Sequence, residues 1–350
     1  MRFLVEAPGL LTTVQDGGRY GYERFGMSPA GPMDRRAFRI ANILVGNRRD
    51  ESALEATVTG PTLVFDGDGV IALTGADMDA ELNGAPCPTY RALAVHAGDR
   101  LSMGAAKEGC RAYIAFFGGL DVPPIMGSRA TALQNRIGGY EGRKLAAGDA
   151  ISVRAEGPIP GNLAGRQAPR PVFSRDITVR VILGPQDDLF TREGLDTFLT
   201  RPYTVSNDFS RMGYRLEGPV IHHVADGNII SDGIVAGAIQ VPTSGQPIIM
   251  MAERQTVGGY TKIATVISAD LPLIGQAKAG DRLHFRSVAV EEAHRALRQE
   301  EQALRQLEES VSSAPAEMPE KQYRIHLNGQ VYHVKIQRIE QEETPCIRSI

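Results

Sequence analysis

Five side chains that can form hydrogen bonds crowd one short stretch of the chain, between two apolar runs. Within nine residues the sequence carries Arg254, Gln255, Thr256, Tyr260 and Lys262, interrupted only by Val257, Gly258-Gly259 and Thr261. The runs 247–250 and 263–267 have the composition of buried strands. A hairpin bend would explain the glycine pair. Polar groups among apolar strands, however, need hydrogen bonds from the protein or from a ligand. The stretch therefore predicts a binding or catalytic site, and its alternative is an exposed hairpin tip.

The region just before this stretch adds two polar residues to the candidate site. Asp232 and Gln240 lie in an apolar, glycine-rich segment that begins at Ser231. A carboxylate and an amide together can orient a small polar molecule. We therefore include both with Arg254, Gly258 and Gly259 as candidate substrate-binding residues.

A second cluster lies near the start of the chain, where glycines allow the backbone to approach a ligand. Gln15, Arg19 and Asp34 supply an amide, a guanidinium and a carboxylate that can hold a planar polar molecule. The structural alternative is a turn in which Asp16 pairs with Arg19, while Asp34 caps a helix predicted over Met33–Val45.

A third cluster is Ser206–Pro219, in which Arg211 and Arg215 bracket Met-Gly-Tyr. On one strand, residues four apart face the same side, so both guanidinium groups would point toward one ligand. The alternative is a solvated edge strand with paired surface charge.

Composition and missing motifs exclude several classes of protein. A net charge of −3 and a pI near 6.2 give no support for a nucleic-acid or anionic-membrane partner. Three dispersed cysteines and seven histidines without ligand spacing predict no metal site. No P-loop, GxSxG or HExxH motif is present, and neither a signal peptide nor a long apolar span is visible. We expect a cytoplasmic protein.

The fold class expected is mainly β, of the α+β kind. Short β-prone runs closed by Gly, Asp or Pro recur along the chain, at 62–65, 70–74, 111–117 and 177–183. An Ala-Gly-Asp turn recurs before three strands, which indicates either an internal duplication or shared turn chemistry. We predict an N-terminal β-rich half (1–157), a linker (158–171), a C-terminal β half (172–287), an amphipathic helix (289–309) and a β-hairpin (320–341).

Several longer motifs carry a resemblance to a known family. TVQDGGRYGYERFGMSPAGPMD, GGLDVPPIMGSRAT, LGPQDDLF, SNDFSRMGYRLEGP and ERQTVGGYTKIATVISADLP occur in the order found in the KipA / allophanate hydrolase subunit 2 family. The chain resembles this family over about residues 1 to 287. The resemblance implies two cyclophilin-like β-barrel halves, to which this chain adds a C-terminal helix and β-hairpin extension.

The resemblance also implies a function in a complex. Family members include the C-subunit of 5-oxoprolinase and the biotin-dependent carboxyltransferase portion of urea carboxylase. Expected partners are a KipI-like protein (the B-subunit of 5-oxoprolinase), a protein like the A-subunit of that enzyme, and a biotin carboxyl carrier protein. The expected cofactors are ATP, bound with partner subunits, or carboxybiotin carried by another protein. A non-catalytic module that binds KipI is the remaining alternative.

The resemblance suggests roles for the candidate residues. Gln255, Thr256 or a backbone N–H of Gly258-Gly259 would stabilise a developing oxyanion. Tyr260 or Lys262 would transfer the substrate N–H proton, and Arg211 or Arg215 would hold a substrate carboxylate.

Overall fold

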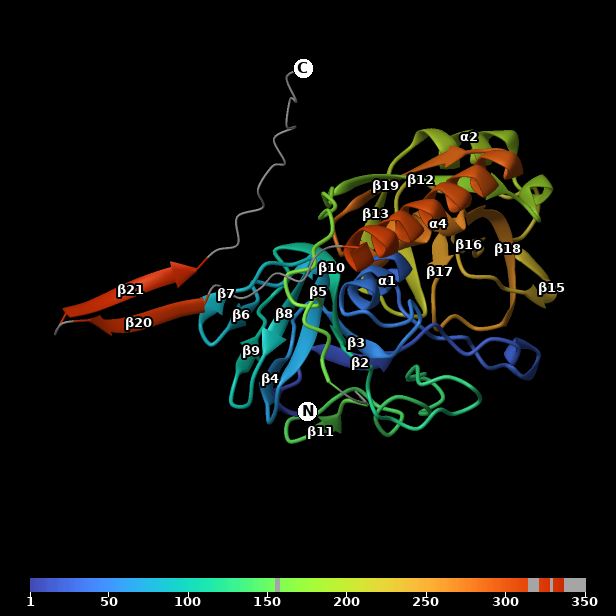
Figure 1. Cartoon of the computed structure of the whole chain (residues 1–350). Coiled ribbons are helices and arrows are strands. Elements are labelled where there is room, and N and C mark those ends of the chain that lie inside the picture. Colours follow the sequence, from blue (N-terminus) through green and yellow to red (C-terminus); the bar gives the residue numbers. More distant parts are fainter. Residues whose placement is uncertain (155–157, 314–320, 328–329, 337–350) are drawn as a thin grey trace, which may run out of the picture.

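A computed structural model describes residues 1–154, 158–313, 321–327 and 330–336 (Figure 1). Strands dominate this part of the chain, and the helices are few. The mainly β fold class predicted from the sequence is confirmed, including the C-terminal helix.

The first half of the chain packs two antiparallel sheets around one apolar core. Its strands are β1 (Arg2–Ala7), β2 (Leu11–Gln15), β3 (Ala53–Thr57), β4 (Thr62–Phe65), β5 (Gly69–Asp77), β6 (Glu81–Leu82), β7 (Ala85–Pro86), β8 (Arg91–Val95), β9 (Arg100–Ser102), β10 (Glu108–Phe116) and β11 (Ala150–Ser152). One sheet has the order β11-β1-β4-β9-β6-β7 and the other β2-β3-β10-β5-β8. Phe3 of β1 stacks on Phe116 of β10 across the core, with ring centroids 4.8 Å apart.

Helix α1 (Arg35–Leu44) covers the outer face of the five-stranded sheet, and η1 (Glu23–Phe25) lies in the loop before it. Ile71 and Leu73 of β5 face the core between the sheets, whereas Val70 and Ala72 belong to the cluster with α1. Because both faces are covered, β5 is buried along nearly its whole length.

The second half forms one eight-stranded sheet that closes on itself. Its elements are β12 (Asp176–Leu183), η2 (Asp187–Leu189), α2 (Arg192–Thr200), β13 (Tyr203–Phe209), β14 (Gly213–Glu217), β15 (Asn228–Gly233), β16 (Ala238–Val241), β17 (Ile248–Met250), β18 (Val257–Val266), η3 (Ser268–Asp270), α3 (Leu271–Gln276) and β19 (Arg282–Ser287). The order is β12-β19-β13-β14-β17-β16-β18-β15, and an added β12–β18 pairing closes the barrel. Strand β16 pairs with one edge of β18. Two strands share the other edge: β15 pairs with the first residues of β18, and β12 pairs with the last residues of β18.

Helix α4 (Val290–Ser313) lies across both halves (Figure 1). Its Ala293 and Ala296 pack on Ile267 and Ala269 of the second half, and its later turns pack on α1. Arg39 and Arg49 of the first half form ion pairs with Glu301 on α4, at 2.6 and 3.0 Å.

Beyond α4, β20 (Lys321–Leu327) and β21 (Gln330–Ile336) pair antiparallel, as the alternating sequence predicts. The turn predicted at Asn328-Gly329 lies outside the described residues, as does residue 320 at one end of the predicted hairpin and 337–341 at the other. The domain boundaries given above stay a prediction.

The recurring Ala-Gly-Asp turn has one geometry in all three places. The aspartate carboxylate accepts a hydrogen bond from the backbone N–H three residues earlier, at 2.7, 2.7 and 3.0 Å for Asp99, Asp149 and Asp281. The glycine before each aspartate has φ between 86° and 92°, which favours glycine. The three turns therefore share one geometry, which either an internal duplication or shared turn chemistry would produce.

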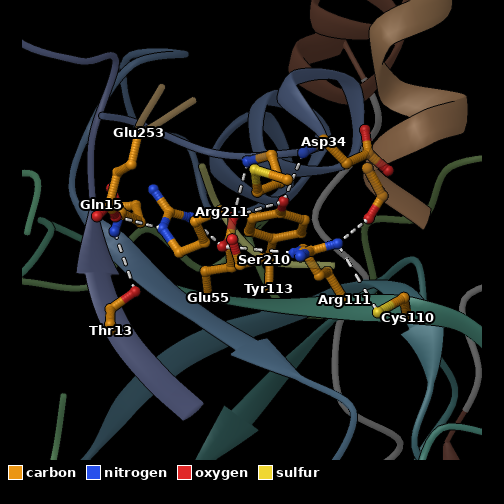
Figure 2. Close-up of polar contacts among 12 residues, drawn as sticks. Thr13, Gln15, Asp34, Glu55, Cys110, Arg111, Tyr113, Ser210, Arg211 and Glu253 are labelled. Atoms are coloured by element: carbon orange, nitrogen blue, oxygen red, sulfur yellow. Dashed lines mark hydrogen bonds and ion pairs between the residues drawn. The ribbon is translucent and has the colours of Figure 1, made fainter. Parts of the chain in front are cut away.

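A buried ion cluster joins the two halves (Figure 2). Arg211 donates from Nε to Glu253 at 2.6 Å, and its two terminal nitrogens donate to Glu55 of β3 and to the carbonyl oxygen of Gly31, the latter at 2.7 Å. Arg211 and both glutamates are at most 3% exposed. The prediction that Arg211 and Arg215 share one side of a strand is wrong, because Arg211 precedes β14 and only Arg215 lies in it.

Hydrogen bonds continue from this cluster across the interface. The second carboxylate oxygen of Glu55 accepts from the Tyr113 hydroxyl at 2.8 Å, and that hydroxyl accepts from the backbone N–H of Asp34 at 2.7 Å. Asp34 then accepts from Gln276 of α3 at 2.8 Å. Arg111 on β10 donates to the Tyr214 hydroxyl of β14 at 2.5 Å. The two halves are therefore fixed by charged and polar groups that have no access to water.

We expect Arg211→Met to lower the free energy of unfolding by about 3–5 kcal/mol, because it leaves two buried carboxylates without the cation that contacts both. Urea unfolding followed by circular dichroism at pH 7.5 measures this. Arg215→Met is the matched control, since Arg215 is 59% exposed and pairs with Asp208 at the surface. It should change the free energy by about 1 kcal/mol or less. Equal effects of the two substitutions would contradict the role of the buried cluster.

Candidate functional site

Lys262 on β18 is the centre of the candidate site. It is 3% exposed, and its ammonium group donates to Asp232 at 2.7 Å and to the carbonyl oxygen of Gly233 at 3.3 Å. The Asp232 side chain is 55% exposed, so the ion pair lies at the edge between interior and solvent. The hydrogen bond from Lys262 holds the pKa of Asp232 below its ordinary value. Gln186 fixes the strand here, because it exchanges two hydrogen bonds of 3.1 Å with the backbone of Lys262.

Gln240 of β16 lies directly opposite Lys262 in the ladder. Its side chain is 2% exposed, and its Nε2 has no hydrogen-bond partner within the described part of the chain. Leaving a buried donor unsatisfied costs about 1–3 kcal/mol. A ligand oxygen that accepts from this amide would remove that cost.

Gly258 leaves room for two amide groups. A Cβ atom at this position would lie 2.9 Å from Gln240 Nε2, 2.9 Å from Gln255 Nε2 and 2.6 Å from Ile234 Cδ1, closer than real Cβ contacts allow. The two amide nitrogens therefore both lie over Gly258, where the strand has no side chain. Such close approach is one reason for glycine inside a strand.

The structure corrects the predicted position of the glycine pair. Gly258 and Gly259 lie within β18, where Gly258 pairs with Asp232, and the turn falls earlier, at Ala252–Thr256. Gly258 thus serves close packing and not a bend.

A row of side chains on one face of the sheet extends from Lys262. The register pairs Lys262 with Gln240, Gln240 with Ile248, and Ile248 with Arg215. Directly opposed residues share a face, and neighbouring strands are about 4.8 Å apart. Arg215 is therefore on the same face as Lys262 but three strand spacings away. On this face the side chains of Lys262 and Gln240 are buried, whereas the side chain of Arg215 on β14 is exposed.

Four other residues predicted for the site differ in how far their side chains are buried. Arg254 is 8% exposed and, within the described residues, donates to two backbone carbonyls, of Ile234 at 3.0 Å and of Met251 at 3.4 Å. Burial lowers the pKa of Arg254, and Tyr20 and Glu23 act in the opposite direction. Gln255 and Tyr260 are exposed and Thr256 is half-buried, so these three side chains lie at the open edge.

Gln15 and Arg19 are buried in the first half, and their side chains bond to its backbone. Gln15 donates to the carbonyl oxygen of Thr131 and accepts from Gly31 N–H. Arg19 donates to carbonyl oxygens of the segment 125–130. The expected Asp16–Arg19 pair is absent among the described contacts, since Asp16 accepts from Ser128 Oγ at 2.6 Å and from Arg129 N–H. These bonds satisfy the Gln15 side chain within the protein, whereas Nη1 of Arg19 is buried without a hydrogen-bond partner among the described residues. The role predicted for both residues as substrate ligands stays a prediction.

Asp34 is a helix cap, the structural alternative stated above. Its carboxylate accepts from Ala37 N–H at 2.9 Å at the start of α1, and from Gln276. Arg211 likewise cannot hold a substrate carboxylate, because both of its acidic partners are buried with it. The predicted site therefore separates into an interface network and the face around Lys262.

This face, which we call the Lys262 face, comprises Gln186, Asp232, Gln240, Arg254, Gln255, Gly258 and Lys262. It presents amide, guanidinium and ammonium donors, which suit a carbonyl oxygen or a carboxylate. Within the described residues, no group of three or more acidic, His or Cys side chains could hold a metal ion. No helix described here is long and apolar enough to cross a membrane.

Sequence reasoning missed residues whose roles depend on the fold. Gln186 lies in the motif LGPQDDLF, which was used only for the resemblance. Glu55 and Gln276 carry no local signal, because their partners are at least 22 residues away in the chain.

Comparisons with known proteins come from sequence and structure. The family described as carboxyltransferase domain, subdomain A and B, matches residues 25–287. The chain is 40% identical to the C-subunit of 5-oxoprolinase from Escherichia coli over 299 residues, which cover 85% of this chain and 95% of that protein. The Haemophilus influenzae C-subunit is 37% identical over the same shares.

A solved structure shares the fold. The crystal structure of Kluyveromyces lactis urea carboxylase superposes with a TM-score of 0.80 and 34% identity, covering 89% of this chain. The match covers 29% of that much longer protein.

The buried carboxyl group of Asp34 should make the stability of the fold depend on pH. Burial raises its pKa from 3.8 to about 6, against the lowering effect of hydrogen bonds from Ala37 and Gln276. A carboxyl group whose pKa is raised by folding stabilises the fold below its unfolded pKa near 4, and this contribution is lost as the pH rises through 6. We expect wild type to lose about 2.5 kcal/mol relative to Asp34→Asn between pH 4 and pH 7.5, because the unfolded carboxyl group is already partly ionised at pH 4. Urea unfolding of both proteins at several pH values measures this, and a constant difference would refute it.

Proposed function

This chain belongs to the carboxyltransferase domain family, subdomains A and B, and we propose that it is one subunit of an enzyme complex acting on the N–C=O group of a small amide. The relatives named as the C-subunit of 5-oxoprolinase favour 5-oxoproline as the substrate and its opening to glutamate as the reaction. The observation that supports the reaction site is the convergence of Gln240 and Gln255 above Gly258, beside Lys262.

In this proposal the substrate carbonyl oxygen accepts from the amides of Gln240 and Gln255, which stabilise negative charge on it. Water adds to the carbonyl carbon and supplies the second oxygen of the new carboxylate. The Lys262 ammonium, held by Asp232, donates a proton to the ring nitrogen as the C–N bond breaks. Tyr260, at the open edge, is an alternative proton donor. Arg254 lies beside this position and suits the substrate carboxylate. ATP bound by partner subunits would supply the activation of the amide, and this chain has no P-loop of its own.

Carboxyl transfer to a urea-like substrate is the second candidate, favoured by the structural match to urea carboxylase. A ureido oxygen of carboxybiotin is also an acceptor that fits the unpartnered Gln240 amide. In this candidate reaction the biotin would be carried by another polypeptide. We expect a KipI-like partner for both reactions. The further partner depends on which reaction is used: a protein like the A-subunit of 5-oxoprolinase for the first, and a biotin carboxyl carrier protein for the second.

The reaction is tested by purifying the chain with these partners and measuring ATP consumption. We expect consumption to depend on 5-oxoproline and to be matched by glutamate formed. Dependence on urea with bicarbonate would replace the first candidate by the second. Dependence on neither would leave a regulatory module that binds its partner without turnover.

The site is tested by Gly258→Ala in the same complex. The new methyl group must displace the converging amides, so we expect kcat to fall by roughly 100-fold, as when an oxyanion donor is lost. Gly259→Ala is the matched control, because its Cβ would meet only Ile229 O at 3.3 Å and Ser231 Oγ at 3.6 Å. Wild-type kcat for Gly258→Ala, with the complex intact, would exclude this site.

A further inference from the structure

A cavity of about 590 Å³ lies between the two halves, separate from the Lys262 face. Its walls come from α1, from α3 and from the connecting segment 169–178. No residue of the Lys262 face lines it. The volume is within the range of about 300–1,000 Å³ that is typical of sites for small organic ligands.

The cavity is lined mainly by apolar groups. Its apolar lining includes Ala37 and Ile40 of α1, Pro272 and Leu273 of α3, and Phe173 of the connecting segment. Packing of this kind suits an apolar ligand body, because its surface is removed from water without breaking hydrogen bonds.

Most basic groups around the cavity already have acidic partners. Arg170 pairs with Glu108 at 2.6 Å, and Arg175 pairs with Asp281 at 3.1 Å. Lys107 pairs with Asp79 at 2.7 Å. These cations are compensated and would gain little from an anionic ligand.

Lys278 differs from the other cations that line the cavity. It is half-buried and, within the described residues, has no carboxylate at ion-pair distance. Its ammonium makes one long hydrogen bond, to the carbonyl oxygen of Ala106 at 3.3 Å. An ammonium has three N–H donors, so donors remain for a ligand. One ammonium without an ion-pair partner therefore borders an apolar cavity, which the carboxyl group of Asp34 also lines.

We propose that this cavity binds a small organic anion with an apolar body. The anionic group contacts Lys278, and the body packs between Ile40 and Leu273. The walls come from both halves and from the segment that connects them, so a bound ligand contacts all three at once and stabilises their arrangement. This site is independent of the proposed reaction.

The matched probes 4-phenylbutyrate and 4-phenyl-1-butanol test the proposal, because they share the apolar body and differ in charge. Isothermal titration calorimetry with the full chain should show one site per chain, with the carboxylate binding at least tenfold more tightly than the alcohol. Lys278→Gln should remove this difference between the probes. Lys107→Gln, at a cavity cation that already has a partner, should leave it unchanged.

Leu273→Trp places a larger side chain in the cavity and should abolish binding of both probes. Leu273 is 37% exposed at the start of α3, so the fold should tolerate the change, and circular dichroism checks this. Equal affinity for the two probes, wild-type discrimination in Lys278→Gln, or binding unaffected by Leu273→Trp would each overturn the proposal. So would the absence of binding to the wild-type chain. None of these readouts depends on turnover, so they are distinct from the test of the reaction.

Discussion

The contact of one arginine with two buried glutamates is the interaction on which the arrangement of this protein depends. Arg211 comes from the second half, Glu55 from the first, and Glu253 from the turn just before β18. Burying an unpaired charge is costly. Separating the two halves, or moving this turn away from them, would leave the charge of Arg211, Glu55 or Glu253 without its partner. Glu253 also accepts from Leu133 N–H of the first half at 3.0 Å. The next two residues are Arg254 and Gln255, so the same contact fixes the segment that borders the Lys262 face.

This arrangement explains why the first half matters to a site built from the second. The side chains of the Lys262 face all come from residues 186–262. The loop before β18 is nevertheless held through Glu253 by Leu133 of the first half and by Arg211, which itself contacts Glu55 and Gly31 of the first half. Helix α4 adds ion pairs between the halves on another side of the molecule. A rigid interface keeps the two converging amides in place, and such preorganisation is what stabilises charge in a transition state.

Local sequence patterns predicted the helices and strands, whereas the roles of individual side chains depend on contacts between residues far apart in the sequence. The strand at 62–65, the helix after Asp34 and the amphipathic helix after residue 288 were all found from spacing and turn residues. Lys262, Gln240 and Asp232 were found because polar groups stood in an apolar segment. Arg211 carried the same local signal, but its partners are 42 and 156 residues away, so its burial could not be predicted. Gly258 was identified correctly as unusual and assigned the wrong cause, since a bend and a close approach both require glycine.

The central claim is that a substrate oxygen lies between Gln240 and Gln255, beside Lys262. A crystal structure of the assembled complex with 5-oxoproline tests it most directly. The account predicts the ring carbonyl oxygen within hydrogen-bond distance of Gln240 Nε2, with the ring nitrogen directed toward Lys262. Density for 5-oxoproline at another place, with Gln240 still unpartnered, would contradict it.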